Sequence, residues 1–187
     1  AAGGLYPPYS GERVLTSGML RTEQTLRLIY GEVLHESWAD LREVRFGIFE
    51  GKNYEELKDD PCYQKWIDSN GTLPFPGGES REQFIRRSME GFDRMMSDIL
   101  KRSEKNTGIQ TDTDSQYLKC DRGTEIPVVT VVHGGTIMAV LSSLTGGEYF
   151  DFQVKNGEGY ETVLEWIQGS WKITSLTKIG CEDSKSE

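Results

Sequence analysis

Apolar and polar positions alternate along this chain with two different periods, and each change of period predicts an element. Between Ile126 and Leu144 an apolar, β-branched run, Pro127–Val132, is followed after two glycines by apolar residues spaced three and four apart. The first pattern is typical of a strand buried on both faces in a parallel sheet. The second is typical of one face of a helix. His133 is therefore expected at a strand-to-helix turn.

A second change of the same kind occurs near the start. The run Arg13–Thr16 predicts a short strand, and the spacing that follows predicts a helix over about Met19–Val33. Arg21 falls in the first turn of this helix, where the helix dipole disfavours a cation unless an anion lies beside it. A guanidinium can bind a phosphate through two parallel hydrogen bonds. The ordinary alternative is a solvated surface arginine.

These two changes predict the α/β class, because parallel strands need crossovers that contain helices. If both strands belong to one parallel sheet, Arg21 and His133 face a common crevice at its carboxyl edge. Gly134 and Gly135 let backbone N–H groups approach an anion at the start of the second helix. On these residues alone, His133 is equally well explained as a turn histidine packed under a loop.

Two further helices are predicted between these regions. One runs through Tyr54–Ile67, with an interruption at Pro61. A Ser-x-x-Gln capping box at Ser80–Gln83 opens the other, which is long. Its core face is predicted to consist of Ile85, Met89, Phe92, Met96 and Ile99.

The remaining pattern predicts one hairpin and two irregular segments. Strands are expected over Gly159–Trp166 and Trp171–Leu176, with the turn at Gly169–Ser170. Ser103–Glu125 is polar and is interpreted as a long surface loop without chemistry. The polar tail Gly180–Glu187 is expected to be flexible.

Composition narrows the class of protein. The 187 residues suit one domain, 1–187, and 30 acidic against 21 basic residues give a formal charge of -9. No basic run favours nucleic acid or an anionic membrane as a partner. The three cysteines lack metal-ligand spacing and are interpreted as thiols in a reducing compartment. No apolar run reaches the length of a membrane span, so we expect a soluble, cytoplasmic protein.

Four stretches resemble the motifs of one known family, in the same order. The matches are Ser17–Thr25 to S-P-L-x-R-A-x-Q-T, Leu41–Gly51 to L-x-E-x-x-[FYL]-G with the W-E-G that follows, Pro76–Ser80 to P-G-G-E-S, and Val132–Gly135 to S-H-G-G. Each motif alone is weak, but four in order are specific. Over residues 12–177 the chain resembles the histidine phosphatase superfamily, in the branch with cofactor-dependent phosphoglycerate mutases and α-ribazole phosphatases.

The resemblance implies a three-layer α/β/α fold with helices on both faces of the sheet. It also implies roles for single residues: Arg21 holds phosphate oxygens, Glu43 is the proton donor, His133 is the family's second histidine, and Gly134 offers a backbone N–H to the phosphate. Without the resemblance, Glu43 is better explained as a solvated loop residue. The substrate is expected to be a small phosphorylated metabolite, with neither metal nor other cofactor.

One departure concerns the attacking group. The family's nucleophilic histidine lies in an R-H-G motif on a first strand, and the printed sequence contains no such motif. His35 lies 14 positions beyond Arg21. On one helix with a rise of about 1.5 Å per residue, this spacing separates the two by roughly 20 Å. His35 is therefore not expected to reach the same phosphate.

Two explanations compete for this departure. Either the natural protein has a first strand that the printed sequence lacks, or the protein has lost its nucleophile and only binds. We favour the first, since that strand lies inside the family's sheet and its loss leaves unpaired backbone in the core. We therefore expect a phosphomonoesterase that works through a phosphohistidine. The alternatives are a phosphoglycerate mutase-like enzyme, which usually carries a longer insertion, and a phosphate-binding pseudophosphatase.

Overall fold

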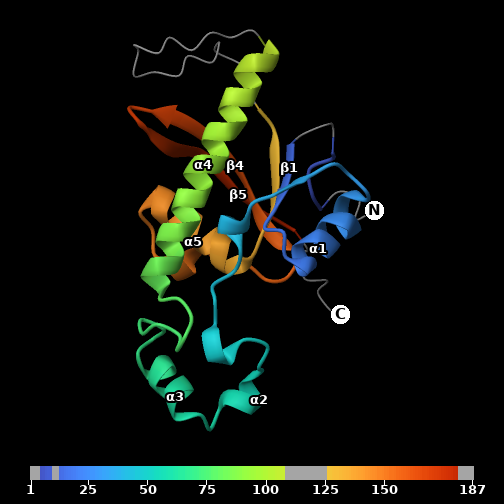
Figure 1. The fold of residues 1–187 in the computed structure, drawn as a ribbon. Helices are drawn as coiled ribbons and strands as arrows, with labels where there is room; N and C mark the ends of the chain where they lie inside the picture. Colours follow the sequence, from blue (N-terminus) through green and yellow to red (C-terminus); the bar gives the residue numbers. More distant parts are fainter. Residues whose placement is uncertain (1–4, 10–12, 108–125, 181–187) are drawn as a thin grey trace, which may run out of the picture.

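The computed structural model describes residues 5–9, 13–107 and 126–180 (Figure 1). Its strands are β1 (Arg13–Thr16), β2 (Glu36–Ser37), β3 (Val128–Val131), β4 (Glu158–Ile167) and β5 (Ser170–Gly180). Its α-helices are α1 (Leu20–Tyr30), α2 (Tyr54–Leu57), α3 (Pro61–Asp68), α4 (Arg81–Thr107) and α5 (Gly134–Thr145). Three short 3-10 helices are η1 (Ala39–Leu41), η2 (Gly47–Phe49) and η3 (Tyr149–Phe152).

The central sheet is parallel, with strand order β2-β1-β3. On β1, the middle strand, Val14 and Leu15 point to opposite faces and are both buried, each 2% exposed. Leu15 packs in the main core with α4 residues such as Phe92 and Met95. The helix α1 covers the other face, opposite α4 and α5 (Figure 1). The predicted α/β fold with a parallel sheet and flanking helices is confirmed.

The prediction that Pro127–Val132 is buried on both faces is wrong. The strand itself is shorter, Val128–Val131, and all four of its residues are only half-buried. Within the described residues β3 lies at the edge of the sheet, paired with β1 alone. An edge strand has neighbours on one side only, so less of its surface is covered.

The helix α1 ends three residues before the predicted Val33. Gly31 adopts a positive φ of 78° and donates its N–H to the carbonyl of Arg27, which terminates the helix. Glycine reaches this backbone conformation without steric cost, so the chain can turn back towards β2 there. In the sequence the helical spacing of apolar residues continues past Gly31 to Val33, so the spacing alone predicts too long a helix.

The long helix α4 begins as predicted, with reciprocal hydrogen bonds between Ser80 and Gln83. It continues to Thr107, so the loop predicted from Ser103 starts later, and 108–125 lie outside the described residues. Two predicted core residues, Phe92 and Ile99, are buried, but Ile85, Met89 and Met96 are half-buried. The buried face also contains Phe84, Ser88 and Met95.

The other two predicted features are confirmed with small shifts. Pro61 begins α3, and the side chain of Asp60 caps it by accepting from two backbone N–H groups. The hairpin β4–β5 forms, but its two-residue turn is Gln168–Gly169, and Ser170 already pairs in β5. Both turn residues have positive φ, as the tight turns of hairpins require.

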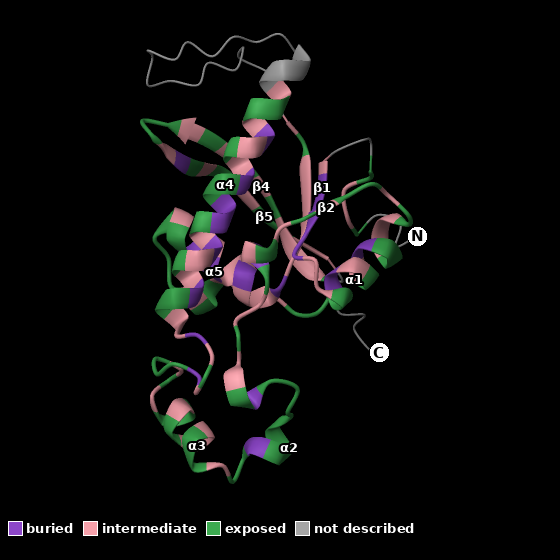
Figure 2. Ribbon diagram, viewed as in Figure 1, coloured by how far each residue is buried: buried purple, intermediate pink, exposed green. Residues whose placement is uncertain are grey.

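Among the residues that the structure describes, many of the buried side chains pack into one large and one small cluster, and Figure 2 shows where buried positions lie along the ribbon. The large cluster lies between the sheet, α4 and the hairpin, where Trp171 packs edge-on against Phe92. The small cluster is centred on Phe49, Leu57 and Phe75. It lies in the segment that carries α2 and α3, beyond the N-terminal end of α4 (Figure 1). Among the described helices none is long and apolar enough to cross a membrane.

Candidate functional site

The two strand-to-helix turns meet at the carboxyl edge of the sheet. β1 and β3 are parallel and in register, with Thr16 opposite Val131, so their last residues lie level. Ser17 then follows β1, and His133 follows β3 as the N-cap residue of α5. The structure therefore brings Arg21 and His133 together, with Arg21 Nε 3.0 Å from His133 Nδ1.

The hydrogen bonds of His133 define its protonation state. Arg21 Nε only donates, so His133 Nδ1 accepts and the ring proton resides on Nε2. Nε2 donates to Ser17 Oγ at 2.8 Å, Ser17 to Thr22 Oγ1 at 3.0 Å, and Thr22 to the carbonyl of Met19 at 2.8 Å. Burial lowers the pKa of His133 to about 4, and the positive charges of Arg21 and Arg87 act in the same direction. The imidazole is therefore neutral at physiological pH.

Glu43 lies beside the first turn of α5. Its Oε1 accepts from the backbone N–H of Val44 at 3.0 Å and also faces Gly135, where a Cβ would collide with it. Burial raises the pKa of Glu43, although the Val44 N–H and the charge of Arg21 act in the opposite direction. A carboxyl group with a raised pKa retains its proton more readily, which is what a general acid needs.

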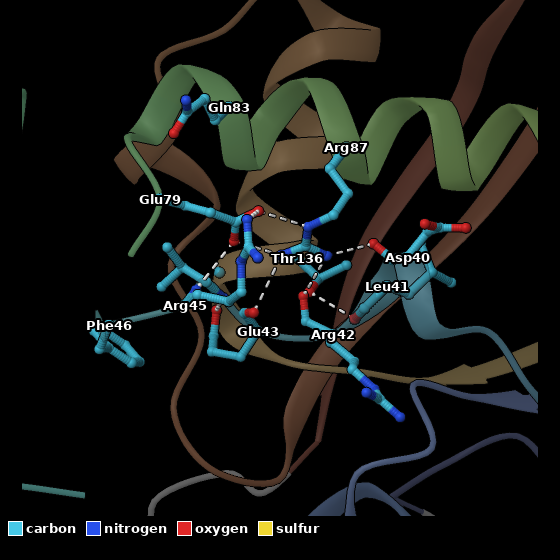
Figure 3. A network of polar contacts seen from close by, with 12 residues as sticks. Asp40, Leu41, Arg42, Glu43, Arg45, Phe46, Glu79, Gln83, Arg87 and Thr136 are labelled. Atoms are coloured by element: carbon cyan, nitrogen blue, oxygen red, sulfur yellow. Dashed lines mark hydrogen bonds and ion pairs between the residues drawn. The ribbon is translucent and has the colours of Figure 1, made fainter. Parts of the chain in front are cut away.

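The backbone before Glu43 is fixed by two side chains that the sequence analysis did not identify (Figure 3). Arg87 of α4 binds both carboxylate oxygens of Glu79, each at 2.8 Å. Its remaining N–H groups hold the segment 40–43 by donating to the carbonyls of Asp40, Arg42 and Glu43. Thr136 of α5 donates to the one carbonyl left in that segment, that of Leu41, at 3.1 Å.

Two further contributors were also missed. Tyr149 of η3 donates to the carbonyl of Gly135 at 3.3 Å, and burial and the charge of Glu43 raise the pKa of Tyr149 to about 12. Ser17 had been noted only as part of a motif. Arg87 had a detectable signal, since it lies one turn after Phe84 on the buried side of α4, and an arginine there needs partners. For Tyr149 we find no signal in the sequence.

Gly134 and Gly135, the two glycines that follow His133, differ in what surrounds them. At Gly135 a Cβ would collide with Glu43 Oε1, so the absence of a side chain leaves room for the carboxylate. At Gly134 the nearest described atom to a built Cβ is Val154 Cγ2, at 3.6 Å, which is ordinary contact. Packing thus leaves Gly134 unexplained, as expected if its backbone serves a ligand.

The predicted position of His35 is wrong. Because α1 ends at Tyr30 and the chain turns back, His35 Nε2 lies 2.5 Å from Glu23 Oε2, in the first half of α1. Glu23 is two positions beyond Arg21. His35 is therefore close to the β1–α1 turn, although its described partners include neither Arg21 nor His133.

A known protein family resembles the part of this chain that contains Arg21 and Glu43. A model of the histidine phosphatase superfamily (branch 1) matches residues 1–108, more than half of the chain. The chain belongs to the histidine phosphatase superfamily. Members of this superfamily are generally enzymes, and membership supports an activity of the phosphatase or mutase type without defining a substrate.

Solved structures similar to this histidine phosphatase superfamily member support the same fold. A putative alpha-ribazole-5'-P phosphatase from Escherichia coli has a TM-score of 0.58 at 18% identity, covering 95% of this chain and 76% of its own. The alpha-ribazole phosphatase from Shigella flexneri has 0.58 at 20%, covering 96% and 80%. A phosphoglycerate mutase from Thermus thermophilus has 0.54 at 22%, covering 93% and 76%. Among curated protein sequences none matches.

The two histidines of this family member are expected to titrate far apart. The pKa of His133 is lowered to about 4, whereas hydrogen bonding to the Val33 carbonyl and the charge of Glu23 raise that of His35 above its ordinary 6.5. In an NMR titration, the ring protons of His133 should shift only near its lowered pKa of about 4. Those of His35 serve as the internal control and should shift above its ordinary value. Two titrations near the ordinary value contradict the described hydrogen bonds.

A second prediction concerns the folding stability of this family member. Because the pKa of Glu43 is raised above 4.5, the stability linked to its proton is present below that ordinary value and is lost as pH rises through the raised pKa. Glu43→Gln retains the acceptor oxygen and removes the charge. It should increase the free energy of unfolding at neutral pH by about 1 kcal/mol and have less effect in acid.

Urea unfolding of both proteins at neutral and acid pH measures this difference. The control is Glu90→Gln, at an exposed position on α4, which should change little at either pH. Destabilisation by Glu43→Gln at neutral pH contradicts the assigned environment of the carboxyl group.

Proposed function

We propose that this protein is a phosphomonoesterase that removes phosphate from a small metabolite through a phosphohistidine intermediate. The observation that carries the proposal is the contact of Arg21 with His133 at the start of α5, beside a carboxyl group whose pKa is raised. A cation, an imidazole, the N–H of Gly134 at the start of a helix and a proton donor form the set that phosphoryl transfer needs. α-Ribazole phosphate is the first substrate to assay, because two similar structures bear that name.

Each residue has a defined part in the proposed reaction. Arg21 is exposed, and among the described residues its two Nη groups have no acceptor, so they are available to phosphoryl oxygens. Gly134 N–H, at the first position of α5, adds a donor with the helix dipole behind it. A bound dianion favours protonation of the neutral His133, because an opposite charge raises a pKa.

In this proposal Glu43 donates a proton to the leaving group. When the ester bond breaks, the leaving oxygen gains negative charge, and a protonated carboxyl group nearby neutralises it. The attacking histidine is assigned to none of the printed residues, since His133 is engaged on both ring nitrogens and His35 binds Glu23 and the Val33 carbonyl.

A second candidate function follows from that last observation. A protein with this site and no attacking histidine binds a phosphorylated ligand without turning it over. Binding without phosphate release by the full natural chain distinguishes this pseudophosphatase from the enzyme. A mutase-like enzyme differs again, since it transfers the phosphoryl group to another hydroxyl in place of water.

The proposed site predicts the effect of two substitutions on turnover. Arg21→Gln and His133→Gln should each lower kcat/KM for p-nitrophenyl phosphate by about a hundredfold, the usual cost of removing one donor to the transition state. Turnover is measured on the full natural chain. The control is Arg27→Gln on the same helix, where Arg27 pairs with Glu32 at the surface. Unchanged rates for both site variants overturn the assignment.

The role of Glu43 predicts a dependence on the leaving group. p-Nitrophenolate needs little protonation, whereas an alkoxide needs a proton from the enzyme. Glu43→Gln should therefore lower turnover of an alkyl phosphate by about a hundredfold and that of p-nitrophenyl phosphate far less. Phosphate release from the two substrates gives the comparison. Equal losses on both argue against an acid role.

A further inference from the structure

A second polar cluster lies next to the candidate site and uses residues that the proposed chemistry does not. Thr16 at the end of β1 donates to Glu23 Oε1 at 2.5 Å, and Ser37 of β2 lies 3.4 Å from the same oxygen. The other carboxylate oxygen, Oε2, lies 2.5 Å from His35 Nε2. The cluster thus joins β1, α1 and β2 at the carboxyl edge of the sheet.

The partners of His35 require both of its ring nitrogens to donate. Nδ1 lies 3.0 Å from the carbonyl of Val33, and a carbonyl oxygen only accepts. Nε2 faces the carboxylate of Glu23, whose pKa is lowered, first of all by the Thr16 hydroxyl. An ionised carboxylate also only accepts. A histidine that donates from both nitrogens is an imidazolium, so His35 is positively charged in this arrangement.

This ion pair is connected to the turn that carries the site. The Thr16 hydroxyl, which donates to Glu23, also accepts the N–H of Gly18 at 3.1 Å, and Thr16 is 0% exposed. Gly18 has a positive φ of 72°, which allows the chain to reverse between β1 and α1. Ser17, between these two residues, holds His133 from the opposite side of the turn. Two sets of hydrogen bonds therefore fix one turn.

We propose that Glu23 and protonated His35 are positioning residues, which hold the β1–α1 turn in the conformation that keeps Ser17 bonded to His133 and presents Arg21 to a tetrahedral dianion. The inference rests on the proposed function in one respect only, namely that the dianion binds at Arg21. Loss of the His35 proton removes one hydrogen bond to Glu23 or Val33 and the attraction between the two charges. The turn then loses one of its supports.

The charged groups around His35 give the direction of the effect. Glu23 faces it from α1, and so does Arg27, which opposes protonation but pairs with Glu32. The next residue, Glu36, pairs with Arg102 of α4. Hydrogen bonding to Val33 and then the charge of Glu23 raise the pKa of His35. The support from the ion pair is therefore complete below the ordinary value of 6.5 and is lost as pH rises through the raised pKa.

Sulfate is a suitable probe, because it remains a dianion across neutral pH and any pH dependence of its binding comes from the protein. In the free protein the pKa of His35 is raised above 6.5 and that of His133 is lowered to about 4, so a titration from about pH 6 to about pH 9 reports on His35. Sulfate affinity of the unaltered chain should fall about two- to fivefold over this range, the scale of a partly exposed ion pair.

Two variants and one control isolate the ion pair. At the acid end of the range, His35→Gln and Glu23→Gln should both bind sulfate more weakly than the unaltered chain. Their affinity should there equal that of the unaltered chain at the alkaline end, and it should not fall further as pH rises. Arg27→Gln should retain the fall, because it leaves both members of the pair in place. A His35→Gln profile that superimposes on that of the unaltered chain overturns the inference.

A measurement without ligand separates this inference from the proposed function. The backbone amide resonances of Ser17 and Gly18 should shift with the same apparent pKa as the ring protons of His35, and this shift should be absent in His35→Gln. If these amides do not follow His35, the inference fails. If they do, but Arg21→Gln binds sulfate as well as the unaltered chain does, the positioning effect stands and the proposed phosphate site fails.

Discussion

The guanidinium of Arg87 is the constraint on which the arrangement of the site depends. All five of its N–H groups have acceptors: two on the carboxylate of Glu79 and three on backbone carbonyls of the segment 40–43. Glu79 is 2% exposed, so this is a paired charge in the interior, and removing either partner leaves the other unpaired. Because Thr136 holds the fourth carbonyl, the peptide that carries Glu43 has little freedom, and its side chain is aimed at α5.

The ionisable groups of the site have pKa values that are shifted in opposite directions. His133 is kept neutral by burial and by nearby arginines, and the ionised form of Glu43 is disfavoured in the same region. His35, which also lies close to the β1–α1 turn but is more exposed, is held in the protonated, charged state by a carboxylate and a carbonyl. Groups whose pKa values are pushed apart within one small region are typical of functional sites. The chain carries a net charge of -9, yet the cation Arg21 points outward at this edge.

The part of this arrangement that could be predicted from sequence follows from short-range patterns. A β-branched run followed by glycine and helical spacing locates the turns at Ser17 and His133. The parallel register of β1 and β3 then places the two turns side by side. The part played by Arg87 could not be predicted, because the backbone carbonyls that it binds lie more than forty positions away in the sequence. The misplacement of His35 has a local cause: Gly31 ends α1 at a point where the apolar spacing alone indicates that the helix continues.

The central proposal is that Arg21, His133 and the first turn of α5 together hold a phosphoryl group. The most direct measurement is a crystal structure of the protein grown with tungstate, a tetrahedral dianion with strong X-ray scattering. We predict that its oxygens lie within about 3 Å of the Arg21 guanidinium, the His133 ring and the Gly134 N–H. Tungstate bound elsewhere, with Arg21 and His133 still bonded only to protein groups, would contradict the account.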